Sequence, residues 1–95
     1  MKVNLATQVV EYVGGRAPQP RRRLRKALRD LESEKGDIKS LQGELDAYCR
    51  LRVGPYRLIF AYRVTGSARE IDVVFCEHRS LVYEAFTVLA GQLRD

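Results

Sequence analysis

Apolar residues recur at helical spacing in three parts of the chain. The clearest part is Arg21–Lys35, where apolar residues three and four apart form one stripe while arginines occupy the other faces. A shorter helix is expected after Thr7, a plausible N-cap, and before Gly14 and Gly15, which would end it. The segment Leu81–Leu93 predicts a C-terminal helix by the same spacing. The stripe in the clearest helix consists of Leu24, Ala27, Leu28 and Leu31.

Other segments alternate between apolar and polar residues, as strands do. A short edge strand is expected near the N-terminus, and three more strands follow the second helix. Their connections, Gly54-Pro55 and Thr65–Ala68, are short enough to make neighbouring strands pair antiparallel. Asp37–Gly43 is expected to be a loop that Leu41 anchors. The four strands are expected at Lys2–Ala6, Leu45–Val53, Tyr56–Val64 and Ile71–Glu77.

The predicted order of elements is therefore β-α-α-β-β-β-α. Strands that follow a pair of helices are typical of an α+β domain, so we expect an antiparallel sheet with both N-terminal helices on one face. The C-terminal helix would cap the domain, and the other sheet face would be open or covered by a partner. A chain of 95 residues has room for one such domain, over 1–95.

The composition indicates where in the cell the protein is located and whether it needs a metal or cofactor. No apolar run approaches the roughly 20 residues of a membrane span, and the N-terminus lacks the pattern of a secretion signal. We therefore expect a cytoplasmic protein with no membrane contact. Cys49 and Cys76 form no CxxC pair and have a single histidine to assist them, so we expect free thiols and no metal or cofactor.

The positive charge is gathered in two places. The net charge is +5, and Arg21–Arg29 holds six basic residues and no acid. Tyr48–Arg63 holds four arginines and no acid. Arginine suits phosphate through its planar fork and can stack on bases, so RNA is a natural partner. A solvated helix face and ordinary strand exteriors would give the same pattern. The candidate RNA-binding residues are Arg22, Arg23, Lys26, Arg52 and Arg63.

The alternation in the second long strand separates its arginines from its apolar residues. Tyr56, Leu58, Phe60 and Tyr62 fall on one face, which belongs against the helices, and Arg57 falls on the other. Arg50 and Arg52 likewise share a face of the preceding strand. An arginine inside an apolar strand needs a partner, and on an open face that partner can be a phosphate.

Three motifs follow one another along the chain as they do in the RelE/ParE superfamily of toxins, which the sequence resembles. Tyr48–Phe60 is similar to the central hairpin of these toxins, in which an aromatic and basic strand leads into G-x-Y-R-L/V-I-Y. His78–Tyr83 looks like the closing H-R-x-x-V-Y, and Asp37–Gly43 is similar to the loop before the hairpin. The resemblance covers nearly the whole chain. It implies a toxin with a cognate antitoxin as partner and a RelE-like fold.

The resemblance implies two possible activities. RelE-like members cut mRNA on the ribosome without a metal, whereas ParE-like members inhibit DNA gyrase. By resemblance Arg57 contacts the scissile phosphate, Arg50 takes the place of a strand lysine proposed to aid catalysis, and Arg79 and Tyr83 complete the nuclease site. Arginine at position 50 is a poor general base because its pKa is too high, and Tyr48 stands where some nucleases have a second lysine.

Proton transfer has two further candidates in the sequence. His78 is the only histidine and has an unperturbed pKa of about 6.5, which suits acid–base work, although a histidine at a strand end is commonly a surface or turn residue. Glu77 beside it is a possible base or an ordinary solvated carboxylate. Tyr83 either stacks on a base or packs its helix on the sheet. The leading hypothesis is an mRNA endonuclease. A gyrase inhibitor and a non-catalytic or inactivated RNA-binding domain are the alternatives.

Overall fold

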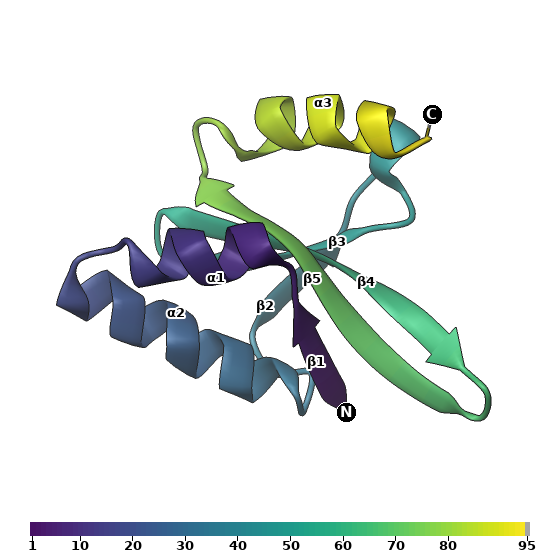
Figure 1. Ribbon diagram of the computed structural model, residues 1–95, viewed down its shortest axis with the longest axis horizontal. Coiled ribbons are helices and arrows are strands. Elements are labelled where there is room, and N and C mark those ends of the chain that lie inside the picture. Colours follow the sequence, from purple (N-terminus) through teal and green to yellow (C-terminus); the bar gives the residue numbers. More distant parts are fainter. Residues whose placement is uncertain (95) are drawn as a thin grey trace.

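The structure is a computed structural model that describes residues 1–94 (Figure 1). It confirms the α+β class and the expected order of the helices and main strands. Its elements are β1 (Lys2–Leu5), α1 (Thr7–Gly14), α2 (Pro18–Leu31), β2 (Asp37–Ser40), a 3-10 turn η1 (Gly43–Leu45), β3 (Cys49–Val53), β4 (Tyr56–Thr65), β5 (Ala68–His78) and α3 (Val82–Arg94).

The strands form one mixed sheet in the order β1-β5-β4-β3-β2. Strands β2 to β5 pair antiparallel through short turns, and Gly54 and Gly66 take the positive φ angles, 56° and 62°, that these turns require. In Figure 1 the long β4–β5 hairpin extends beyond the other strands, toward the lower right. The far end of this hairpin is therefore separated from the β3–β4 turn by the length of the sheet.

Two details of the sheet differ from the expectation of a purely antiparallel sheet with a loop at 37–43. Strand β1 runs parallel to β5, because the chain crosses over through both helices before it returns to the sheet. Asp37–Ser40 is a strand and not a loop, because it pairs with β3 and places Ile38 opposite Leu51. Its single apolar residue at an inward position gave too little alternation to predict a strand.

Helices α1 and α2 cover one face of the sheet, as expected. Leu24, Leu28 and Leu31 are buried against it, which confirms the predicted stripe. Helix α2 is shorter at its C-terminal end than expected, because the chain tightens into i→i+3 bonds after Leu31 and Glu34 takes a φ of 54°. Thr7 is the first residue of α1 and does not cap it with its side chain. The α1–α2 pair and the sheet thus enclose the larger core.

Helix α3 covers part of the opposite face, so that face is less open than expected. Val82, Phe86 and Ala90 of α3 are buried on Ile59 of β4, with Val74 and Phe75 of β5 packed beside them. A bulge in β5 brings both of these neighbours to the same side, since Ile59 pairs with Phe75 and Phe60 with Val73. Figure 1 shows α3 at the top of the view, apart from α1 and α2. The two ends of this sheet face remain uncovered.

Candidate nucleic-acid interface

The expected arginines gather at one end of the sheet, around the β3–β4 turn. The turn consists of Gly54 and Pro55, and the backbone N–H of Arg79 donates to the Pro55 carbonyl oxygen over 2.8 Å. That bond ties the end of β5, and the segment that leads into α3, to the turn. Strands β3 and β4 and the segment after β5 therefore meet at this turn.

Arg52 and Arg57 lie directly opposite each other on β3 and β4. Both are on the face away from α1 and α2, because their neighbours Leu51, Val53 and Leu58 are buried in the larger core. Two like charges directly opposite in a sheet repel each other, so the pair is costly unless an anion lies between or above it. The cross-strand pair is therefore a natural site for a phosphate.

Arg57 is held in place by the turn itself. Its Nη1 donates to the carbonyl oxygens of Gly54 and Tyr56, each over 2.9 Å, and its side chain is half-buried. Neither acceptor is a carboxylate, and within residues 1–94 Arg57 forms no ion pair. The guanidinium is thus oriented by neutral groups and keeps its full charge for a ligand.

The acid opposite Arg57 on β5 is turned away from it. Glu77 is the register partner of Arg57, but its Oε1 accepts the backbone N–H of His78 over 2.8 Å. Its carboxylate also interacts with Tyr12 of α1. The pKa of the Tyr12 phenol is raised, chiefly by burial and then by its hydrogen bond with Glu77. Glu77 is therefore engaged at the outer edge of β5 and leaves the charge of Arg57 uncompensated.

Arg50 is on the same face but is already paired. Its Nη1 donates to the Asp37 carboxylate over 3.1 Å and to the Asp37 carbonyl oxygen over 2.9 Å, and its side chain is only 16% exposed. Strand β2, which was not expected, supplies this partner. Arg50 therefore stands beside the arginine pair with much of its charge neutralised by Asp37.

Arg79 and Tyr83 come from the segment after β5 and from the start of α3. Arg79 is exposed and follows β5, where its backbone is bound to Pro55. Tyr83 is in the first turn of α3 and is 39% exposed, outside the core that its neighbour Val82 joins. Of the two roles weighed for Tyr83, its exposure favours stacking on a ligand over packing of the helix.

His78 is on the opposite side of the sheet from Arg57. It is the register partner of Tyr56, and the two rings are in edge contact with centroids 6.3 Å apart. Its Nδ1 accepts the backbone N–H of Ser80 over 3.2 Å and lies 2.8 Å from the Ser80 hydroxyl. The structure therefore does not bring His78 together with the arginines as a proton donor or acceptor.

The other candidate RNA-binding residues are spread over the molecule. Arg63 is at the far end of β4, where it binds Asp72 over 2.8 Å and Glu70 over 3.0 Å. These bonds, first the one to Asp72, raise the pKa of Arg63, while the bonds from Arg63 and then Asn4 lower the pKa of Asp72. Arg63 is thus committed to an ion-pair network and is remote from Arg57.

The three candidates on α2 are on the opposite face from Arg57. Arg22 and Arg23 are exposed, and Lys26 pairs with Asp30 over 2.8 Å. Arg23 reaches the β3–β4 turn from the helix side: a Cβ added to Gly54 would lie 3.0 Å from its Nη1. This approach could not be predicted from the sequence, because it depends on the way that α2 packs on β3.

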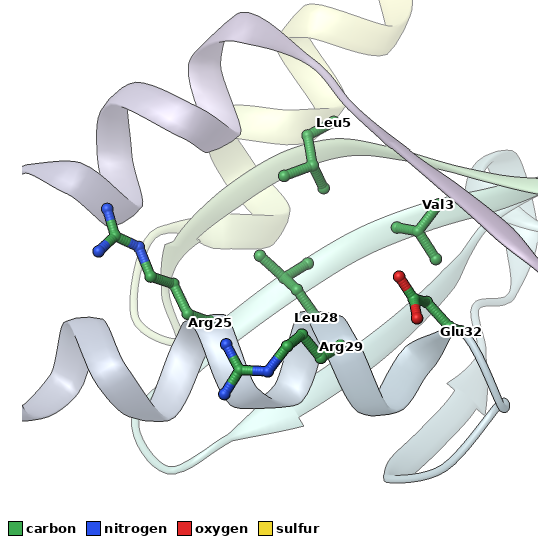
Figure 2. Close-up of a pocket in the computed structure, with 6 residues that line it drawn as sticks. All are labelled: Val3, Leu5, Arg25, Leu28, Arg29 and Glu32. Atoms are coloured by element: carbon green, nitrogen blue, oxygen red, sulfur yellow. The ribbon is translucent and has the colours of Figure 1, made fainter.

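An apolar groove lies elsewhere, between β1 and α2. Figure 2 shows leucine and valine side chains from both elements facing the groove, with charged residues of α2 along its side. Strand β1 is an edge strand, so its outer backbone groups are available for pairing. The lining residues are Val3, Leu5, Arg25, Leu28, Arg29 and Glu32.

Two features are absent from the described part of the chain, a cluster of metal-ligating side chains and a membrane-spanning helix. Within residues 1–94 no group of three His, Cys, Asp or Glu side chains comes together as a metal site would require. No helix in this range is long and apolar enough to cross a membrane.

Solved structures similar to this chain include toxins and toxin–antitoxin complexes. The RelE–RelB complex from Pyrococcus horikoshii OT3 has 28% identity over 82% of this chain and 93% of that chain, with a TM-score of 0.62. The RelB–RelE complex from Methanococcus jannaschii has 25% identity over 87% of this chain and 98% of that chain, with a TM-score of 0.64. A YoeB/ParE toxin from Agrobacterium tumefaciens shares the fold at 17% identity. The match covers 83% of this chain and 99% of that chain, with a TM-score of 0.63.

Neither a protein-family model nor a curated protein sequence matches the chain. The structural likeness nevertheless extends over 82–87% of this chain and 93–98% of the two RelE–RelB toxin chains. The chain therefore has the fold of RelE and YoeB/ParE toxins, and this likeness supports its assignment to the RelE/ParE superfamily of toxins.

Proposed function

We propose that this protein is the toxin of a toxin–antitoxin pair and cleaves mRNA on the ribosome. The observation that carries the proposal is the state of Arg57. It is fixed by two carbonyl oxygens, lacks an ion pair within residues 1–94, faces Arg52 across the sheet, and lies beside the turn to which Arg79 is bound. Three arginines with few local acids form a phosphate clamp on a rigid sheet end.

The reaction that this clamp supports is attack of an RNA 2′-hydroxyl on the adjacent phosphate. The new bond forms between the 2′-oxygen and phosphorus, the bond to the 5′-oxygen breaks, and the products carry a 2′,3′-cyclic phosphate and a 5′-hydroxyl. Charge builds on the phosphoryl oxygens in the transition state, and preorganised arginines stabilise it there. Tyr83 supports the same role by offering an exposed ring on which a neighbouring base can stack.

One observation favours the second candidate, a gyrase inhibitor of the ParE kind. RNA cleavage benefits from a general base and a general acid, each worth about 10²–10⁴ in rate. His78 lies on the other sheet face, Glu77 is engaged with His78 and Tyr12, and Arg50 is paired with Asp37. An arginine cluster without these groups would suit binding to an acidic protein surface as well.

The two candidates are separated by one experiment in cells. The chain is expressed alone, mRNA 5′ ends are mapped, and the supercoiling activity of gyrase is assayed in parallel. The proposal expects new 5′ ends within coding regions and unchanged supercoiling. Loss of supercoiling without new 5′ ends would establish the gyrase inhibitor instead.

The partner that we propose is a cognate antitoxin, as in the RelE–RelB complexes that share this fold. The groove between β1 and α2 fits an amphipathic, acidic segment, because its floor is apolar and Arg25 and Arg29 lie along it. The edge of β1 could pair with an added strand. We expect the complex to weaken with salt, since charge complementarity is screened at high ionic strength. An affinity that does not change with salt would contradict an electrostatic contact.

A further inference from the structure

Aromatic rings form a row on the α1 side of the sheet end, opposite the arginine clamp. Tyr12 of α1 contacts Tyr56 of β4 with ring centroids 6.2 Å apart, and Tyr56 contacts His78 of β5 over 6.3 Å. Both contacts are edge-on, with interplanar angles of 75° and 84°. The guanidinium of Arg16 lies 4.1 Å above the Tyr12 ring. All four side chains are half-buried, so part of each remains open to solvent.

A hollow lies beside this row, between the start of α2 and the β3–β4 turn. Its volume of about 310 Å³ is at the lower end of the range of small-molecule sites, and it is open to solvent. One aromatic ring, two proline rings and one cation form most of its walls, while Gln19 adds an amide that can both donate and accept hydrogen bonds. The lining residues are Gln19, Pro20, Arg23, Pro55 and Tyr56.

Two arginines lie at or beside the hollow. Arg23 lines it, and Arg16 lies on the ring of Tyr12, which contacts Tyr56. Arg23 lies against the turn, with its guanidinium next to Gly54, and Pro18, Gln19 and Pro20 form the first turn of α2. The N-terminus of this helix adds a partial positive charge at the same place. A negatively charged ligand with a flat, polarisable ring matches both features.

We propose that this hollow binds one nucleotide of a single-stranded RNA. The base stacks on Tyr56 between the proline rings and is bonded by Gln19, and its phosphate is bound by Arg23. Stacking on aromatic side chains beside basic residues is the general way in which proteins hold single strands. An acidic peptide would satisfy Arg23 but would make no use of the flat walls.

This site rests on the proposed function in one respect: the RNA that it binds is taken to be the strand that is cleaved at Arg57. Tyr56 and Arg57 are consecutive residues of β4 and point to opposite faces. A strand whose scissile phosphate lies on Arg57 can therefore pass around the Gly54-Pro55 turn and place a neighbouring nucleotide in the hollow. The hollow would fix the register of the RNA without touching the reacting atoms.

Binding to an uncleavable RNA tests the site separately from the reaction. The probe is a single strand of about ten nucleotides, within the usual site size for single-strand binders. Its riboses are 2′-O-methylated to block cleavage, and it carries 2-aminopurine bases, whose fluorescence is quenched by stacking. The proteins compared are wild type, Tyr56→Leu, Tyr56→Phe, Arg23→Gln and, as a matched control, Lys35→Gln, which removes an exposed positive charge outside the hollow.

We expect Tyr56→Leu to lose part of the quenching and about tenfold in affinity, and Tyr56→Phe to retain both. Arg23→Gln should lower the dependence of log K on log salt by about 0.7, the value for one phosphate contact on a single strand, and Lys35→Gln should not. A Tyr56→Leu variant that melts like the wild type and binds equally well would overturn the site. If Tyr56→Leu does not fold, an unchanged salt dependence for Arg23→Gln overturns it.

The outcomes also separate this site from the proposed function. RNA binding that depends on Tyr56, in a protein that cuts no mRNA, would keep the site and reject the nuclease. Cleavage that requires Arg57 but is indifferent to Tyr56 and Arg23 would keep the nuclease and reject the site. Failure of the RNA to bind, with an acidic peptide bound at Tyr56 instead, would assign the hollow to a protein partner and overturn the inference.

Discussion

Replacing Arg57 with alanine should abolish toxicity while the protein stays folded. The substitution removes two hydrogen bonds of 2.9 Å from a charged donor to the carbonyl oxygens of Gly54 and Tyr56. A bond to a charged group contributes about 1.5–3 kcal/mol, but Arg57 is half-buried and water can replace it at the turn. We therefore expect the free energy of unfolding to fall by about 1–2 kcal/mol, or a Tm lower by roughly 4–16 °C.

The functional loss should be larger than this loss of stability. Removing one preorganised donor to a developing oxyanion typically lowers the rate by about 10²–10³, or roughly 2.7–4 kcal/mol. Most domains have about 5–15 kcal/mol of stability, so the variant should remain folded during a growth assay. The assay pairs induced growth with a thermal melt on the same variants, with Lys35→Ala as a toxic, stable control. A well-folded Arg57→Ala protein that remains fully toxic would refute the phosphate clamp.

Four further substitutions test the fold. Phe86→Ala should lower the free energy of unfolding by about 3–5 kcal/mol in urea titrations, because Phe86 is fully buried between α3 and the sheet. Asp72 has a lowered pKa, chiefly through its bond from Arg63, so its stabilisation is present above its unfolded pKa of about 3.9 and is lost as pH falls through the folded value. The Tm advantage of wild type over Asp72→Asn should therefore shrink as the pH falls below the unfolded pKa, and an advantage that does not change with pH in acid would contradict the pairing. Gly54→Ala and Gly66→Ala both place an alanine at a positive φ, which costs about 1–2 kcal/mol each. Only at Gly54 does the added Cβ also meet a guanidinium, so Gly54→Ala should have the lower Tm. Equal melting temperatures for the two variants would argue against that contact.

The local patterns in the sequence were sufficient for most of the fold. The stripe that includes Leu24, Leu28 and Leu31 located α2, and alternation along β4 placed Leu58 and Phe60 on one face and Arg57 on the other. Each of these predictions depends only on the period of a single element. They were confirmed because one buried face is enough to determine the orientation of a helix or strand.

Features that depend on pairing between distant segments could not be predicted in the same way. Strand β2 forms because its backbone pairs with that of β3. Asp37 of β2 then forms the ion pair that neutralises much of the charge of Arg50. The coverage of Ile59 by α3 likewise depends on how the C-terminal helix returns to the sheet. The position of His78 on the opposite face from Arg57 follows from its register with Tyr56, which the sequence does not encode locally.

The groups at the β3–β4 turn were predicted one by one, but their arrangement was not. The sequence and the resemblance singled out Arg52, Arg57 and Arg79, and the structure brings all three to the turn. The anchoring of Arg57 by carbonyl oxygens and the diversion of Glu77 toward α1 appear only in three dimensions. Their roles in RNA cleavage stay a prediction.

The most direct test of the central claim uses purified protein and ribosomes loaded with a defined mRNA. Wild-type protein and Arg57→Ala are incubated with these ribosomes, and the mRNA ends are identified by primer extension and by their reactivity with a kinase. We predict that the wild type produces new ends that carry a 5′-hydroxyl and that Arg57→Ala produces about 10²–10³ times fewer. Intact mRNA in the presence of folded wild-type protein, together with inhibition of purified gyrase, would contradict the nuclease.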